Sequence, residues 1–126
     1  MTITGLKFIS ERLSAAGVPY CFEEWTKEIQ YPYFVGEYTE SESMNEDGES
    51  DSTFILTGTS RGEWLSLEKE KEKIKSIFPE NGITAVLENK SCIAVFYSSA
   101  MPVPTGTDEL KRIQINLKVK EWRCNI

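Results

Sequence analysis

LKRIQINLKVKEW, residues 110–122, alternates apolar and polar side chains more clearly than any other stretch of the chain. The apolar members are Ile113, Ile115, Leu117 and Val119, and the polar members between them are Arg112, Gln114, Asn116, Lys118 and Lys120. Because successive side chains of a strand point to opposite faces, this period predicts an antiparallel strand over Leu110–Trp122 with one face on a core and one face in water. Such a strand spans roughly 40 Å at about 3.3 Å per residue, so we expect its far end to project beyond the body and meet a neighbour.

Four shorter strands are expected before it. Tyr33–Glu40 and Ser52–Thr59 are rich in β-forming residues and are separated by the polar segment SESMNEDGES, which predicts a hairpin with a long loop. Ile83–Leu87 and Cys92–Ser98 are the next two apolar runs. The segment AMPVPTGTD that follows contains two prolines and a glycine, so we expect it to be coil that cannot join a central strand.

Two helices are expected. Leu6, Ile9, Leu13 and Ala16 recur at helical spacing over Thr4–Ala16, and Gly17 and Pro19 predict its end, with the glycine as a left-handed cap. A second apolar stripe, made by Trp64, Leu67, Ile74 and Phe78, predicts a helix over Glu63–Phe78. Ser60 and Glu63 have capping-box spacing, and the EKEKEK run is interpreted as a solvated outer face.

These elements predict one α+β domain over residues 1–126. The 40% hydrophobic content is enough for one core. The expected order is α-β-β-α-β-β-β, with a mixed, mainly antiparallel sheet of about five strands packed against the two helices. The aromatic-rich stretch Tyr20–Tyr33 fits either a short helix or an entering strand, and its periodicity does not decide between them.

Composition argues against most catalytic chemistries. The chain contains no histidine, which is the commonest general base and metal ligand, and it has neither a Walker lysine loop nor a G-x-G-x-x-G turn. We therefore expect no cofactor, no metal site and no enzymatic activity. Glu23, Glu24 and Glu28 lie near Phe22 and Trp25, which leaves open a pair of carboxylates of the glycosidase type.

The cysteines and the net charge bear on compartment and partners. Cys21, Cys92 and Cys124 are odd in number and far apart, which indicates free thiols and no disulfide framework. A formal charge of -6 repels phosphates, so we expect no nucleic-acid partner. No apolar run reaches the length of a signal peptide or a membrane span, so a cytoplasmic location is expected.

Charge is unevenly distributed along the chain. The predicted hairpin is wholly acidic, whereas residues 108–126 hold five basic groups against three acidic ones. Opposite poles on one chain allow head-to-tail contact between identical copies. The candidate partner-binding residues are Glu40, Glu42, Glu46, Asp47, Glu49, Asp51, Arg112, Lys118, Lys120 and Arg123. The alternative is that these charges only solvate two surfaces.

The segments YPYFVGEYTESE, STFILTGTSRGEW and LEKEKEKIKSIF, followed by the amphipathic last strand, resemble small tail-completion proteins of bacteriophages and prophages. The chain is similar in element order to the lambda gpU-like tail terminators. That resemblance implies a hexameric ring that caps the tail tube and contacts the head connector, first in the cytoplasm of the bacterial host and then in the virion tail. It transfers no individual functional residue.

Three other readings stay open. A head-closure or minor capsid protein of a phage would also act through protein contacts. An acidic inhibitor or regulatory protein would be a monomer that binds a basic enzyme. A small hydrolase would need a concave pocket with paired carboxylates.

Overall fold

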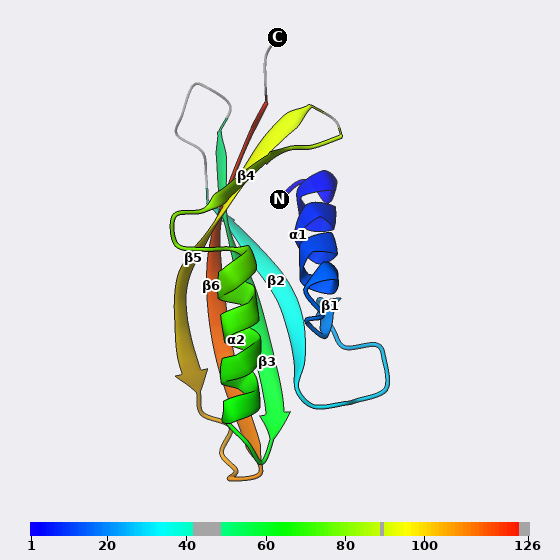
Figure 1. Ribbon diagram of the computed structural model, residues 1–126, viewed down its shortest axis with the longest axis vertical. Coiled ribbons are helices and arrows are strands. Elements are labelled where there is room, and N and C mark those ends of the chain that lie inside the picture. Colours follow the sequence, from blue (N-terminus) through cyan, green and yellow to red (C-terminus); the bar gives the residue numbers. More distant parts are fainter. Residues whose placement is uncertain (42–48, 89, 124–126) are drawn as a thin grey trace.

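The computed structural model describes residues 1–41, 49–88 and 90–123 of the chain. Within these residues two helices and six strands follow one another (Figure 1). Their bounds are α1 Ile3–Ala15, β1 Tyr20–Phe22, β2 Tyr33–Ser41, β3 Ser50–Arg61, α2 Leu65–Ile77, β4 Ile83–Val86, β5 Ser91–Val103 and β6 Leu110–Arg123. The architecture is α+β, as predicted.

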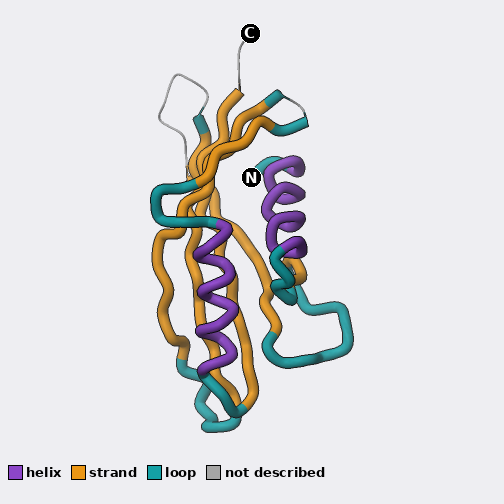
Figure 2. Tube along the Cα trace, viewed as in Figure 1, coloured by secondary structure: helices purple, strands orange, loops and turns teal. Residues whose placement is uncertain are grey.

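The strands of the described residues form one curled, mixed sheet in the order β1-β2-β3-β6-β5-β4 (Figure 2). β1 runs parallel to β2, and every other pair of neighbours is antiparallel. β6 lies at the centre, because it pairs with β3 from Leu110 to Glu121 and with β5 from Arg112 to Arg123. The far end of β6 is therefore held on both sides, and the expectation that it projects beyond the body is wrong.

Both helices cover the same face of the sheet. Ile9 and Leu13 of α1 and Leu67 and Ile74 of α2 are fully buried and belong to one core cluster. The strands contribute Phe34, Phe54, Leu56, Ile93, Val95, Ile113, Ile115, Leu117 and Val119 to the same cluster. The apolar face predicted for β6 is confirmed, and the opposite face of the sheet has no helix in the described residues.

Helix α1 begins on a buried carboxylate. Thr2 is its N-cap, and the Thr2 hydroxyl accepts a hydrogen bond from the Gly5 amide at 3.0 Å. The Glu121 side chain belongs to a residue only 4% exposed and accepts hydrogen bonds from the Thr2 amide, at 3.2 Å to Oε1, and from the Thr2 hydroxyl. A negative charge is favourable at a helix N-terminus, so Glu121 fixes α1 on the sheet. Gly17, with φ at +78°, ends the helix as predicted.

Helix α2 differs from expectation at its start and on its charged face. Its N-cap is Trp64, which makes no side-chain capping bond, and Ser60 lies in β3 with its hydroxyl 2.7 Å from that of Ser66. The predicted capping box is therefore absent. The EKEKEK run is not wholly exposed to solvent either, because Glu70 within it is buried.

Two strands were missed or shortened in the sequence-based prediction. Tyr20–Phe22 forms the parallel edge strand β1, which gives the sheet its sixth strand. β5 continues to Val103 through Ala100 and Pro102, where coil was expected. Proline is tolerated there because β4 pairs with β5 only between Cys92 and Val95, so this half of β5 is an edge.

The cysteines also differ from the prediction of free thiols. Cys21 is free, whereas Cys92 is disulfide-bonded, so that prediction is wrong for Cys92. Cys124 lies outside the described residues. Neither helix of the described part of the chain has the length and apolarity that crossing a bilayer requires.

The phenol of Tyr20 predicts a loss of stability at alkaline pH. Burial, with a smaller effect of Cys21, raises the pKa of Tyr20 to about 12, and its ring lies 6.3 Å from that of Phe54. An unfolded tyrosine has a pKa of about 10. Because the folded state holds this proton more tightly, the Tyr20 phenol contributes stability that is fully present below pH 10 and is lost as the pH rises toward 12. Allowing for screening of a partly exposed group, we expect the free energy of unfolding to fall by about 1–2 kcal/mol over that range.

Urea denaturation at several alkaline pH values measures this effect. Tyr20→Phe should remove that part of the alkaline slope, whereas Tyr31→Phe, at an exposed position, should keep it. An unchanged slope in Tyr20→Phe would contradict the assignment.

Candidate interaction surface

The helix-free face of the sheet carries the polar row of β6, defined as Arg112, Gln114, Asn116, Lys118 and Lys120. These residues alternate with the buried apolar members of the strand, as predicted. Three of the candidate partner-binding residues, Arg112, Lys118 and Lys120, therefore share one face. Their neighbours on β3 are Thr59, Thr53 and Asp51, in that order.

Hydrogen bonds order this polar row. The Gln114 amide donates to Asn116 Oδ1 at 3.1 Å, and the Asn116 amide donates to Ser99 Oγ of β5 at 3.1 Å. Arg112 Nε donates to Thr59 Oγ1 of β3 at 3.4 Å. These hydrogen bonds connect β6 to β3 and to β5. The polar row is therefore a rigid surface that holds its cationic groups in place.

The acidic and basic candidates are closer together than the hypothesis of opposite poles requires. β3 and β6 pair so that Asp51 lies beside Lys120. Lys120 Nζ also lies 3.4 Å from Glu49 Oε1 in the same chain. Part of the acidic hairpin therefore neutralises part of the basic strand within one molecule, and the two groups are not separate poles at this point.

The remaining candidates fall elsewhere. Glu40 is exposed on β2, and its carboxylate pairs with the terminal amino group of Met1. Glu42, Glu46 and Asp47 lie outside the described residues, and so does the side chain of Arg123. The structure therefore brings Glu49, Asp51, Lys118 and Lys120 into one region and separates Glu40 and Arg112 from it.

An exposed aromatic pair, which no sequence pattern predicts, marks the β1–β2 edge of the sheet. The rings of Phe22 and Tyr38 stack at 6.1 Å between centroids and remain 37% and 36% exposed. Phe22 also stacks on the buried Phe54 at 6.4 Å. The pair is therefore held in place from below, while one side of it faces solvent.

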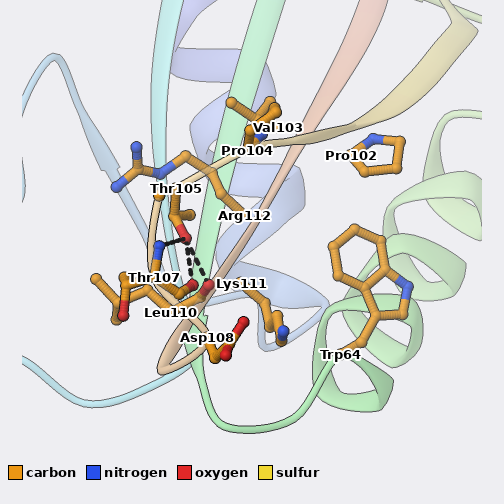
Figure 3. A pocket seen from close by; sticks show the side chains of 11 residues that line it. Trp64, Pro102, Val103, Pro104, Thr105, Thr107, Asp108, Leu110, Lys111 and Arg112 are labelled. Atoms are coloured by element: carbon orange, nitrogen blue, oxygen red, sulfur yellow. Dashed lines mark hydrogen bonds between the residues drawn. The ribbon is translucent and has the colours of Figure 1, made fainter.

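A hollow of about 640 Å³ lies at the end of the β5–β6 hairpin. Figure 3 shows Trp64 and Pro102 near one another on the α2 side, and the loop with Thr105 and Asp108 on the other. Thr105 Oγ1 stiffens that loop, since it lies 2.9 Å from the Thr107 carbonyl oxygen and 2.8 Å from that of Leu110. Lys111 adds a cationic group, so the hollow suits an apolar or acidic side chain better than a basic one.

The carboxylates considered for glycosidase chemistry are placed on an exposed loop. Glu23, Glu24 and Glu28 all lie in the β1–β2 loop, residues 23–32, and are exposed to solvent. No group of three or more metal-ligating side chains gathers among the residues that the structure describes.

Comparison with known proteins gives information on the fold alone. The chain matches no protein-family model and no curated protein. A solved protein structure superposes on it with a TM-score of 0.67 at 13% sequence identity, over 96% of this chain and 92% of its own length. The chain is thus similar in fold, over nearly its whole length, to a protein with which it shares little of its sequence.

Proposed function

We propose that this chain is a non-enzymatic subunit that associates head to tail with copies of itself into a ring, in the manner of the phage tail terminators that its sequence resembles. The ring would cap a tail tube and meet the head connector. The observation that supports this proposal best is that, among the described residues, no strand pairs with the outer side of β2 beyond Gly36 or with the outer side of β4.

The first open edge belongs to β2. β1 pairs only with Phe34–Gly36, so no strand of the described residues lies beside Glu37–Ser41 on that side. The Phe34 amide and the Gly36 carbonyl point toward β1, bonding Pro19 and Glu23. Backbone direction alternates along a strand, so the amides and carbonyls of Tyr38 and Glu40 point to the open side. An unpaired backbone row of this kind accepts another strand.

The second open edge belongs to β4, the last strand in the order, which has no further strand beside it in the described part of the chain. Helix α1 approaches only its end, where Lys7 Nζ lies 3.4 Å from Glu88 Oε1. The Leu87 amide donates to the Ser91 carbonyl of β5, so the alternation turns the backbone groups of Thr84 and Val86 outward. The Val86 side chain is 72% exposed. By contrast, Pro102 lies on the half of β5 that pairs with β6 but not with β4, and it lacks an amide, which favours β4 over β5 as the place for pairing.

Pairing of the β2 edge of one copy with the β4 edge of the next is a heterologous contact. Such a contact repeats, and it makes a ring when its rotation closes. The exposed Phe22–Tyr38 pair would add apolar burial beside the new strand pair. The polar row of β6 lies on the helix-free face, away from both edges, which leaves it available for tail-tube or connector proteins.

Solution mass tests the proposal. Size-exclusion chromatography with light scattering should give a multiple of the 14.4 kDa chain mass. Backbone pairing is insensitive to screening, so the mass should persist at high salt, whereas a contact made by the charged residues should weaken. Val86→Lys and Tyr38→Lys should each return the protein to a monomer, because lysine on an edge strand opposes pairing.

Leu65→Lys is the matched control, since it makes the same kind of change at an exposed apolar residue on α2. A protein that is monomeric at low and at high salt would contradict the ring and would favour the alternative that the chain is an acidic inhibitor. A ring that survives both edge variants would place the contact on another surface.

A further inference from the structure

The two open edges of the sheet run in the same direction. β2 is antiparallel to β3, β3 to β6, β6 to β5 and β5 to β4. Because the direction reverses at each of these four pairings, β2 and β4 are parallel to each other within one molecule. When copies join edge to edge in one orientation, β4 of one copy therefore runs parallel to β2 of the next.

On β2, the outward backbone groups belong to residues whose side chains lie on the face that carries the helices. The Phe34 amide donates outward to the Pro19 carbonyl, and the Phe34 ring is fully buried in the core. Tyr38 has the same parity and lies opposite Phe54 of the core in the β2–β3 register. Thr39, the next residue, therefore has its side chain on the helix-free face and its backbone groups turned toward β3.

On β4, the parity is reversed. Ile83 and Ala85 pack against the core, so their side chains lie on the helix side, and their backbone groups are turned toward β5. The outward backbone groups belong to Thr84 and Val86, whose exposed side chains lie on the helix-free face. Outward backbone groups thus go with helix-side residues on β2 and with residues of the other face on β4.

This difference in parity is the one that parallel pairing requires. The β1–β2 pair of the same molecule shows the pattern, because Phe34 lies opposite Tyr20 but donates to Pro19, the residue before it. A residue that turns its backbone toward a parallel neighbour thus lies opposite a residue that turns away from it, with both side chains on one face. Parallel pairing of the two open edges therefore keeps the helices of both copies on the same side.

Antiparallel pairing of these edges would turn successive copies over. Residues that turn their backbone groups toward each other then lie directly opposite, with their side chains on one face. Tyr38 would meet Val86, so the helix side of one copy would continue into the helix-free face of the next. Such a contact turns each copy over while it advances along the sheet, which gives an open fibre, whereas parallel pairing needs only a bend of the sheet and can close.

We propose that β4 of one copy adds in parallel to the outer side of β2 of the next copy, directly beyond β1. This inference rests on the self-association given under the proposed function, and it adds the direction and the register of the contact. All the helices then lie on one wall of the ring. All the polar rows of β6 lie on the other wall, where they form a repeated cationic surface for a partner protein.

The position of β1 sets the register. The Gly36 carbonyl already accepts a hydrogen bond within the β1–β2 pairing, so the added strand begins opposite Tyr38. With Ile83 opposite Tyr38, the Thr84 amide donates to the Tyr38 carbonyl and the Glu40 amide donates to the Thr84 carbonyl. A shift by two residues in one direction would place Ile83 on the strand position that β1 occupies.

Cysteine cross-linking of the full chain tests both direction and register. Thr39 and Thr84 are exposed, and the proposed register places them directly opposite one another on the helix-free face, within reach of a disulfide. In a Cys21→Ser background, Thr39→Cys combined with Thr84→Cys should on mild oxidation give a ladder of covalent multiples of 14.4 kDa, which a reducing agent abolishes. Mixing the two single variants should give only a linked dimer, which keeps the test available if the double variant fails to fold.

Glu40→Cys combined with Thr84→Cys is the matched control, because it moves one cysteine by one residue. In the parallel register these two side chains lie on opposite faces, so no ladder should form, whereas antiparallel pairing would place them opposite one another. If the parent chain is an oligomer, links in the control, or none between Thr39→Cys and Thr84→Cys, would overturn the parallel contact and leave the ring standing. A monomeric parent chain would instead overturn the proposed function, and this contact with it.

Discussion

Replacing Phe54 with alanine is expected to lower the free energy of unfolding by about 3–5 kcal/mol, the range for removing a buried aromatic ring. Phe54 lies on β3 and is fully buried. Its ring occupies the space above Gly36 of β2, since a Cβ added to Gly36 would come within 2.7 Å of Phe54 Cζ. β3 is paired with β2 on one side and with β6 on the other. The side chains around Phe54 therefore cannot move far enough to fill the cavity that its ring leaves.

Removal of the Phe54 ring should also change the packing at the open edge of β2. Tyr20 and Phe22 of β1 both contact the Phe54 ring, at 6.3 and 6.4 Å between centroids. Without that ring, the exposed Phe22–Tyr38 pair loses its support from below, so Phe54→Ala should weaken the proposed self-association as well as folding.

Ile55→Ala is the matched control for Phe54→Ala. It removes an apolar side chain from the next residue of the same strand, which points to the helix-free face and is only half-buried. We expect a loss of about 1 kcal/mol there. Urea denaturation followed by tryptophan fluorescence measures both variants, and equal losses would mean that the two faces of the sheet are equally covered.

Glu121→Ala is expected to lower the free energy of unfolding by about 2–4 kcal/mol. The change removes hydrogen bonds to a charged group and leaves the Thr2 amide and hydroxyl without their acceptor at the start of α1. Gly5 is close to the same carboxylate, since a Cβ there would come within 2.7 Å of Glu121 Oε2. Thr4 Oγ1, at 3.1 Å, remains a partner for the Thr2 hydroxyl, whereas the Thr2 amide loses its acceptor.

A double-mutant cycle isolates the Glu121 contact. Thr2→Ala alone and Glu121→Ala alone should each destabilise the chain, and the two together should lose less than the sum, with a coupling of about 1–2 kcal/mol. Additive losses in the urea denaturation of the four proteins would contradict a direct interaction. Glu121→Gln, which keeps the acceptor oxygen but not the charge, should fall between the parent chain and Glu121→Ala.

The sequence predicted the parts of the fold that depend on local periodicity. The alternation around Ile113 and Leu117 identified both the buried and the polar face of β6, and the stripe containing Leu67 and Ile74 identified α2. Glu121 continues the parity of the buried members of β6, so an inward carboxylate could have been expected there. Its partner could not, because Thr2 is 119 residues away.

The features that the sequence could not predict depend on contacts between distant segments. Tyr20–Phe22 is too short to show a period, and it is a strand only because β2 offers a parallel partner. Pro102 is acceptable in β5 because β4 begins only at Ile83, opposite Val95, and leaves the later part of β5 without a neighbour on that side. The proximity of Glu49 to Lys120 follows from the β3–β6 register, which charge composition does not contain.

The position of β6 has a consequence for synthesis on the ribosome. Within residues 1–126 it is the last element to be translated, yet it is the central strand on which β3 and β5 both pair. Until it leaves the exit tunnel, the nascent polypeptide carries two half-sheets, β1-β2-β3 and β5-β4, that have no common strand. Assembly of the sheet must therefore follow translation of this segment, and during that interval the incomplete chain is open to chaperones and to aggregation.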